Sequence, residues 1–114
     1  MRFMVIVKAT KASEAGDLPD EKLLTDMGKF NEELVKAGVM LAGEGLQPSS
    51  KGVRVRFSGK KRSVTDGPFS ETKDVIGGYS VIVAKDLNEA AQIGSGCPIL
   101  DSGGKVEVRP VRQM

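Results

Sequence analysis

The sequence predicts an α+β fold of the ferredoxin-like βαββαβ type, with one β-hairpin inserted after its second strand. Three observations lead to this prediction. A segment with helical periodicity covers residues 19–37, and a second helix begins at Asp86. An alternating stretch at residues 53–65 is interrupted by a Gly-containing turn, which is typical of a hairpin. Short apolar runs of strand character occupy residues 2–8, 39–42, 79–84 and 105–111.

Length and composition restrict the class of protein. The 114 residues correspond to a single domain, residues 1–114. With 17 basic and 15 acidic residues and no tryptophan, the chain lacks the strongly basic, aromatic surface expected for direct nucleic-acid binding. The apolar run at the N-terminus is too short to span a membrane and has no signal-peptide features, so we expect a cytoplasmic protein without membrane contact.

Two residue counts limit the possible chemistry. Histidine is absent, which excludes Ser-His-Asp and Cys-His catalysis and any imidazole metal ligand. Cys97 is the single cysteine, so the chain has neither an internal disulfide nor a thiolate cluster for zinc. We expect Cys97 to be a packed thiol in a reducing compartment, and we expect no metal and no organic cofactor.

The first strand and the helix after it have clear patterns. In residues 2–8, Phe3 and Val5 point to one side while Met4 and Ile6 point to the other, so both faces are apolar. Residues 9–17 are expected to be a polar loop. Pro19 suits the first turn of the following helix, and Gly38 suits its end as a C′ residue. The apolar stripe of this helix consists of Leu23, Met27, Phe30, Leu34 and Ala37.

A carboxylate between two glycines follows the second strand. Residues 39–42 are apolar, and Gly43-Glu44-Gly45-Leu46 ends the strand. Glu44 is either an exposed turn residue or a pocket carboxylate, with space beside it that the glycines leave for a ligand.

The predicted hairpin is strongly basic. Val53, Val55 and Phe57 alternate with Arg54 and Arg56, as in a half-buried strand. The hairpin is either a solvated edge that charge protects against unwanted pairing, or a rim at which Arg54 or Arg56 attracts an acidic small molecule.

The segment after the hairpin contains a rigid corner. Asp66-Gly67-Pro68 is typical of a turn, and Phe69 follows as an apolar anchor. Asp66 either caps backbone N–H groups or forms, with Glu71, the acidic part of a pocket that has Phe69 as its floor. In that second case burial would raise the pKa of a carboxyl group and allow acid–base catalysis near neutral pH.

The last elements complete the pattern. Asp86 and Glu89 form a capping box at the start of the second helix, which ends at Gly96. In the final strand Glu107 and Arg109 share one face, and Arg109 becomes a candidate anion ligand if that face lines a cleft.

Two helices cover only one face of the predicted sheet. Its central strands are apolar on both sides, so the other face leaves apolar surface in water, at a cost of about 25 cal/mol per Å². A second copy of the chain is the simplest cover, and we therefore expect a homodimer in which the two sheets face each other.

The corner and several other motifs resemble a known family. Asp66-Gly67-Pro68-Phe69 is similar to the signature of the DGPF proteins, part of the YCII-related group within the dimeric α+β barrels. Support comes from residues 43–46, Glu71, residues 77–79 and residues 106–110. The resemblance implies a ferredoxin-like subunit, a dimer, a cleft beside the sheet, and a connection to extracytoplasmic-function sigma factors. A His/Asp pair proposed for YCII-like relatives does not carry over, because this chain has no histidine, so Asp66 would act alone or with Glu44 or Glu71.

Two hypotheses about function follow. In the first, the chain is a cofactor-free, isomerase- or lyase-like enzyme for a small anionic or aromatic molecule. Asp66 or Glu44 is then the acid–base group. The substrate-binding residues are Arg56, Phe69, Glu71, Tyr79 and Arg109. In the second, the chain is a non-catalytic ligand- or partner-binding module that acts with a sigma factor. The missing histidine and the lack of a nucleophile favour the second hypothesis slightly.

Overall fold

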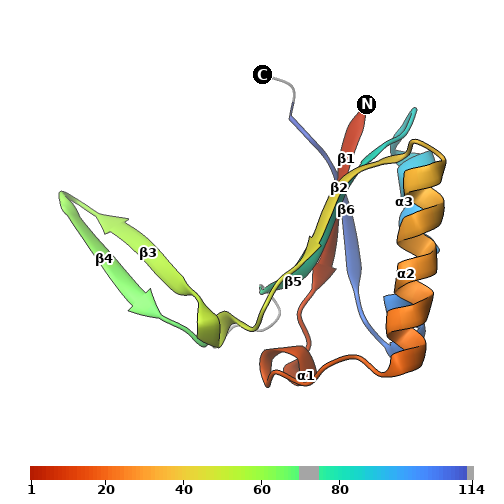
Figure 1. Ribbon diagram of the computed structural model, residues 1–114. Coiled ribbons are helices and arrows are strands. Elements are labelled where there is room, and N and C mark those ends of the chain that lie inside the picture. Colours follow the sequence, from red (N-terminus) through yellow and green to blue (C-terminus); the bar gives the residue numbers. More distant parts are fainter. Residues whose placement is uncertain (70–74, 113–114) are drawn as a thin grey trace.

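A four-stranded antiparallel sheet with two helices against one face forms the body of the structure (Figure 1). The structure is a computed structural model that describes residues 1–69 and 75–112. The strands are β1 (Arg2–Lys8), β2 (Met40–Gly45), β5 (Ile76–Val83) and β6 (Val106–Pro110). They lie in the order β2-β5-β1-β6. This order confirms the predicted ferredoxin-like fold, with β1 and β5 as the central strands.

The two long helices are α2 (Glu21–Lys36) and α3 (Leu87–Ser95). Asp20 is the N-cap of α2, and its carboxylate accepts the Leu23 N–H at 2.8 Å. The helix therefore begins after Pro19, which lies outside the first turn where the sequence had placed it. Gly38 follows the C-cap with a φ of 72°, as a C′ residue does. Asp86 caps α3 as predicted.

The predicted polar loop at residues 9–17 contains a short helix, α1 (Lys11–Glu14). The Thr10 hydroxyl accepts the Ser13 N–H at 3.1 Å, and the Ser13 hydroxyl oxygen accepts the Thr10 N–H at 2.8 Å. This reciprocal pair is a capping box with serine where glutamate or glutamine is usual. The prediction of an irregular loop was wrong because a helix of four residues is too short to show an apolar stripe in the sequence.

Strand register separates the two faces of the sheet. Phe3 pairs with Ile82 on the helical face, where they are 1% and 0% exposed. Ala90 of α3 is equally buried there, and Val5 and Ala84 complete the core cluster. A Cβ at Gly94 would lie 2.9 Å from a methyl carbon of Val108, so this glycine lets α3 approach β6 closely.

The opposite face of the sheet, called here the open face, has no helix over it in the described part of the chain (Figure 1). Its central side chains come from β1 and β5, in which Met4 pairs with Val81 and Ile6 pairs with Tyr79. Ile6 is buried among its neighbours, whereas the other three are half-buried. A lone subunit thus leaves apolar sheet surface uncovered, as the sequence indicated.

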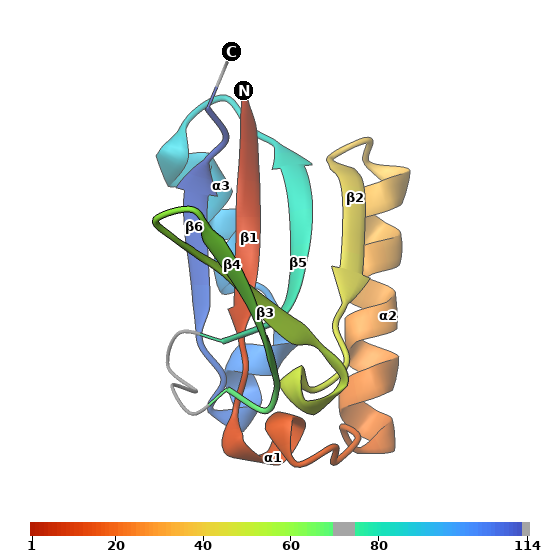
Figure 2. The same cartoon turned by 90° about the vertical axis from the view of Figure 1, so that its left-hand side faces the viewer.

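The inserted hairpin forms a separate two-stranded sheet, β3 (Val53–Ser58) and β4 (Lys61–Asp66). Residues 53–66, called here the arm, project from the body on the side opposite the helices (Figures 1 and 2). Val53, Val55 and Phe57 are between 55 and 66% exposed, so the prediction of a half-buried strand was wrong for the single chain. The alternating pattern marks an apolar face, but among residues 1–69 and 75–112 no other element packs extensively against it.

Candidate functional site

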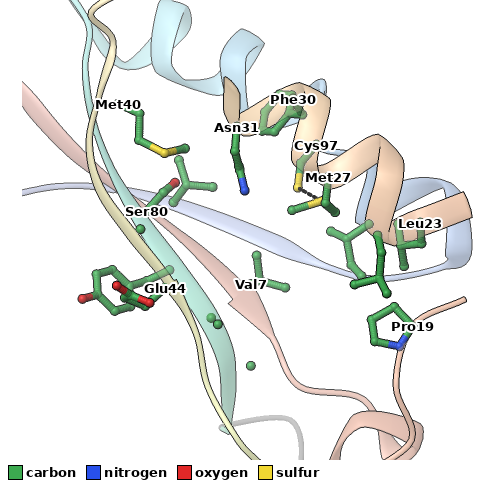
Figure 3. Close-up of a pocket in the computed structure, with 18 residues that line it drawn as sticks. Val7, Pro19, Leu23, Met27, Phe30, Asn31, Met40, Glu44, Ser80 and Cys97 are labelled. Carbon is green, nitrogen blue, oxygen red and sulfur yellow. Dashed lines mark hydrogen bonds between the residues drawn. The ribbon is translucent and has the colours of Figure 1, made fainter. Parts of the chain in front are cut away.

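A cleft of about 380 Å³ lies between α2 and the sheet (Figure 3). Its wall on the helix side is the apolar stripe that the sequence predicted. Leu23, Met27 and Phe30 of this stripe all line the cleft. No residue of α2 is buried, because the cleft separates this stretch of helix from the sheet. Space therefore exists here that the rest of the fold does not fill.

Four glycines from β2 and β5 line the sheet side of the cleft: Gly43, Gly45, Gly77 and Gly78. Without side chains, they expose backbone as a flat floor. A Cβ at Gly78 would lie 3.0 Å from the Glu44 carbonyl oxygen, so the close approach of the two strands favours glycine. A Cβ at Gly45 would meet nothing within 4 Å, which shows that the space above this residue is empty.

Sulfur-containing side chains form another part of the cleft wall. The buried Cys97 thiol donates a hydrogen bond to Met27 Sδ at 3.8 Å (Figure 3). Met40 also lines the cleft, and Asn31 supplies an amide. Burial raises the pKa of the Cys97 thiol, an effect that a hydrogen bond with the Ile99 backbone partly opposes. Cys97 is therefore a neutral, packed thiol, as predicted, and a weak nucleophile.

Glu44 and Tyr79 both contribute to the cleft lining, and they pair with each other across β2 and β5. The residues before and after each of them along its strand face α2. Because strand side chains alternate, both side chains point to the open face. Figure 3 shows the Glu44 side chain on the side of β2 away from Met27 and Phe30. Glu44 lies within β2 and is exposed, so it is neither a turn residue nor a carboxylate inside this cleft.

Arg109 also belongs to the open face, where it pairs with Met4 across β1 and β6. Its side chain is exposed, and so is Glu107 on the same strand. The Glu107 carboxylate lies 3.8 Å from Lys8 Nζ. Three of the predicted site residues, Glu44, Tyr79 and Arg109, thus share the open face of the sheet, and of these only Glu44 and Tyr79 also belong to the cleft lining.

Of the remaining predicted site residues, Arg56, Asp66 and Phe69 lie in the arm or at its base. Asp66 is exposed and pairs with Val53 at the end of β4, and Arg56 is exposed in the middle of β3. Phe69 is half-buried, with the Arg54 guanidinium carbon 4.3 Å from its ring centroid, a cation–π contact. Glu71 lies outside the described residues. The structure therefore does not bring Asp66, Arg56 or Phe69 to the cleft.

A cluster of polar groups that the sequence did not reveal holds the corner in place. Ser49, in the 3₁₀ helix η1 (Ser49–Lys51), is only 8% exposed. Its N–H and its hydroxyl both donate to the Glu14 carboxylate, and its hydroxyl oxygen accepts the Phe69 N–H at 3.0 Å. One prediction for Asp66 was that its carboxylate would accept backbone N–H groups. Glu14, in the helix α1 that was not predicted, accepts such a group from Ser49. A capping box at Thr10 was the available signal for α1, whereas nothing in the sequence marks Ser49.

Gly67 is closely packed against the backbone of Ser49. Its N–H donates to the Gly52 carbonyl at 3.0 Å. A Cβ at this position would lie 1.8 Å from the Ser49 carbonyl oxygen, which no side chain can tolerate. The motif at residues 66–69 thus has a structural role, because it packs the base of the arm against η1 and, through Ser49, connects it to α1.

Residues 1–69 and 75–112 contain neither a metal site nor a membrane-spanning helix. No three Cys, Asp or Glu side chains there converge to form a metal site. No helix within these ranges is long and apolar enough to cross a membrane.

Comparison with known proteins gives a family and a fold. The sequence model of the YCII-related domain matches residues 1–114. An uncharacterised protein of Rhizobium meliloti strain 1021 is 31% identical over 93 residues, covering 81% of this chain and 75% of that protein. A solved structure of 5-chloro-2-hydroxyhydroquinone dehydrochlorinase from Burkholderia phenoliruptrix AC1100, in complex with 2,5-dihydroxybenzoquinone, has a similar fold. Its TM-score is 0.59 at 14% identity, with 100% of this chain and 96% of that chain covered.

Proposed function

This chain belongs to the YCII-related domain family, and we propose that it binds a small, flat, mainly apolar ring compound in the cleft under α2. The observation that carries the proposal is the cleft itself, about 380 Å³ of space between an apolar helix face and a floor of glycines. Ligand sites in proteins have volumes of about 300–1,000 Å³, so this one suits a ligand of one or two rings.

The cleft lining determines the chemistry of the proposed ligand. Aromatic and thioether groups such as those of Phe30 and Met27 pack well against ring faces. The glycine floor allows a flat molecule to lie against backbone, and Asn31 can hydrogen-bond one polar substituent. No arginine or lysine lines the cleft in the described ranges, which favours a neutral ring over the anionic compound that the sequence had left open.

The comparisons support a ligand of this class without identifying it. The dehydrochlorinase of similar fold was solved with 2,5-dihydroxybenzoquinone, a single-ring compound. A fold of this size and type therefore accommodates a ring of the proposed dimensions. The reaction of that enzyme is not transferred, because the two chains share 14% identity.

A thermal-shift screen tests the proposal. The panel consists of hydroxylated benzenes, naphthols and quinones, with aliphatic dicarboxylates as non-aromatic compounds. A ligand present at 100 times its dissociation constant adds about 2.7 kcal/mol to the stability of the folded state. We expect at least one ring compound, and no dicarboxylate, to raise the melting temperature.

A matched pair of glycine variants localises the binding. In Gly45→Val the new side chain enters the empty space of the cleft, so the variant should fold and lose the ligand-induced shift. In Gly28→Ala the new methyl group also meets nothing within 4 Å, but Gly28 does not line the cleft, so the shift should match that of the wild type. A ligand that stabilises Gly45→Val as much as the wild type would overturn the proposal.

The acid–base roles of Asp66 and Glu44 stay predictions, as do the substrate-binding roles of Arg56, Phe69, Glu71, Tyr79 and Arg109. Because the Arg109 side chain lies on the open face and does not line the cleft, a reaction that used it would require a site separate from the cleft. Arg109→Ala should leave ring binding in the cleft unchanged, which ligand titration can measure. The connection to a sigma factor also stays a prediction.

A further inference from the structure

The strand register gives the arm one mainly apolar face and one polar face. The mainly apolar face has charged residues only at its ends, where Asp66 pairs with Val53 and the Arg62 guanidinium lies 5.9 Å from the Phe57 ring centroid. Val55 pairs with Val64, and Phe57 pairs with Arg62, on the same face as Val53. Arg54 and Arg56 pair with threonine and serine on the other face. The four apolar side chains, those of Val53, Val55, Phe57 and Val64, are between 55 and 66% exposed.

An arm of this kind is not expected to remain bare in water. An isolated two-stranded hairpin is marginally stable at best, and it needs a third strand or another packed layer. Within the described ranges, no element other than its partner strand packs extensively against either strand of the arm. Residues 1–69 and 75–112 therefore supply no covering layer for the arm, which makes another molecule the candidate cover.

The position of the arm indicates which molecule that is. The arm projects from the side of the body on which the sheet has no helix, and in Figure 2, viewed from that side, it stands in front of the sheet. The open face and the arm thus border the same region of space. A stable interface buries about 800 Å² on each partner, more than a strip of four side chains supplies. One partner that covers both surfaces satisfies this requirement.

Charge distribution favours a second copy of this chain as that partner. The chain has 17 basic and 15 acidic residues, of which the arm holds five and one, so the remainder has 12 and 14 and is net acidic. The basic residues of the arm are Arg54, Arg56, Lys60, Lys61 and Arg62. A basic arm and an acidic body attract each other between two identical chains, and a two-fold axis lets both arms bind at once.

We propose that the arm docks on a second copy of this chain in a closed two-fold dimer. Each arm packs its apolar face, Val53, Val55, Phe57 and Val64, against the body of the other chain, while the open faces of the two sheets stack. The arm is then an element that clasps the partner. It is neither a solvated edge nor a rim that attracts anions.

Sedimentation of neighbouring variants on β4 tests this inference. Val64→Glu places a charge on the apolar face, whereas Ser63→Glu places the same charge one residue away on the polar face. We expect the wild type to sediment as a dimer at about 10 µM, because interfaces of standard size have dissociation constants from about micromolar down to picomolar. Val64→Glu should weaken dimerisation about a hundredfold or more, because a two-fold interface contains the substituted position twice. Ser63→Glu should change it less than about threefold.

Circular dichroism completes the experiment. Val64 is exposed in the single chain, so the far-ultraviolet spectrum of Val64→Glu should show that the body keeps its fold. A wild type that is monomeric would overturn the inference. A dimer that Val64→Glu leaves intact would also overturn it, and would assign the arm to a different macromolecule, such as a nucleic acid or an unrelated protein. Equal weakening by Val64→Glu and Ser63→Glu would refute the assignment of the apolar face.

Discussion

Replacing Ser49 with alanine removes one hydroxyl that joins three segments of the chain. The hydroxyl donates to the Glu14 carboxylate of α1 and accepts the Phe69 N–H of the corner. The Ser49 backbone N–H still donates to Glu14, at 3.0 Å, so the variant loses two of the three hydrogen bonds in the cluster. The methyl group of alanine fits in the space of the serine, so no steric effect obscures the loss.

The structure allows the cost to be estimated. Leaving a buried donor without its acceptor costs about 1–3 kcal/mol, and a hydrogen bond to a charged group contributes about 1.5–3 kcal/mol. Ser49 is 8% exposed, but Glu14 and Phe69 are half-buried, so water can partly replace the lost contacts. We therefore expect Ser49→Ala to lower the free energy of unfolding by about 2 kcal/mol, slightly less than the smallest sum of the two contributions.

Urea unfolding of two serine variants measures this cost. Ser95 is the matched control, because its exposed hydroxyl donates one hydrogen bond, to the Gln92 carbonyl at 2.7 Å. Ser95→Ala should change the free energy of unfolding by less than about 0.5 kcal/mol. A double-mutant cycle with Glu14→Gln should give a coupling energy of about 1 kcal/mol between positions 14 and 49. Equal effects of Ser49→Ala and Ser95→Ala, or additive effects in the cycle, would refute the role assigned to the cluster.

Three other perturbations have calculable outcomes. Gly67→Ala should destabilise the chain by about 3 kcal/mol in urea unfolding, because its Cβ would lie 1.8 Å from the Ser49 carbonyl oxygen. Gly28→Ala should instead stabilise it by up to about 1 kcal/mol in the same assay, since this helical position has free space. Burial raises the pKa of the Cys97 thiol from its usual value of 9.0, so the folded chain retains a proton that the unfolded chain loses. The free energy of unfolding should therefore fall as the pH rises above about 9, and part of this fall should be absent from Cys97→Ala when both are unfolded at a series of pH values.

The main elements were predictable because each has a local cause. The stripe from Leu23 to Phe30 gave α2, and the glycines at 38 and 96 marked the ends of the two long helices. The βαββαβ order then leaves few ways to arrange the strands, so the central positions of β1 and β5 followed. The short helix α1 escaped prediction because its capping box lies among small polar residues with no apolar pattern.

The candidate site was less predictable than the fold. The sequence indicated space for a ligand beside Gly43 and Gly45, and it included Gly77 and Gly78 in the family resemblance. All four glycines line the cleft. Their neighbour Glu44 was predicted to be either an exposed turn residue or a pocket carboxylate. Strand alternation directs its side chain to the other face, and a pocket assignment from sequence depends on knowing which face α2 covers.

The order of residues, taken alone, determined what depends on near neighbours along the chain: where the two long helices and the strands form, and which side of each is apolar. Contacts between distant segments decided the rest. Glu14 meets Ser49 across 35 residues, and the arm leaves the body although its alternating pattern is that of a packed strand. The physical reason is that the hydrophobic effect is not directional. An apolar pattern in the sequence shows that a surface tends to be buried, but only the folded structure shows which segment lies close enough to bury it.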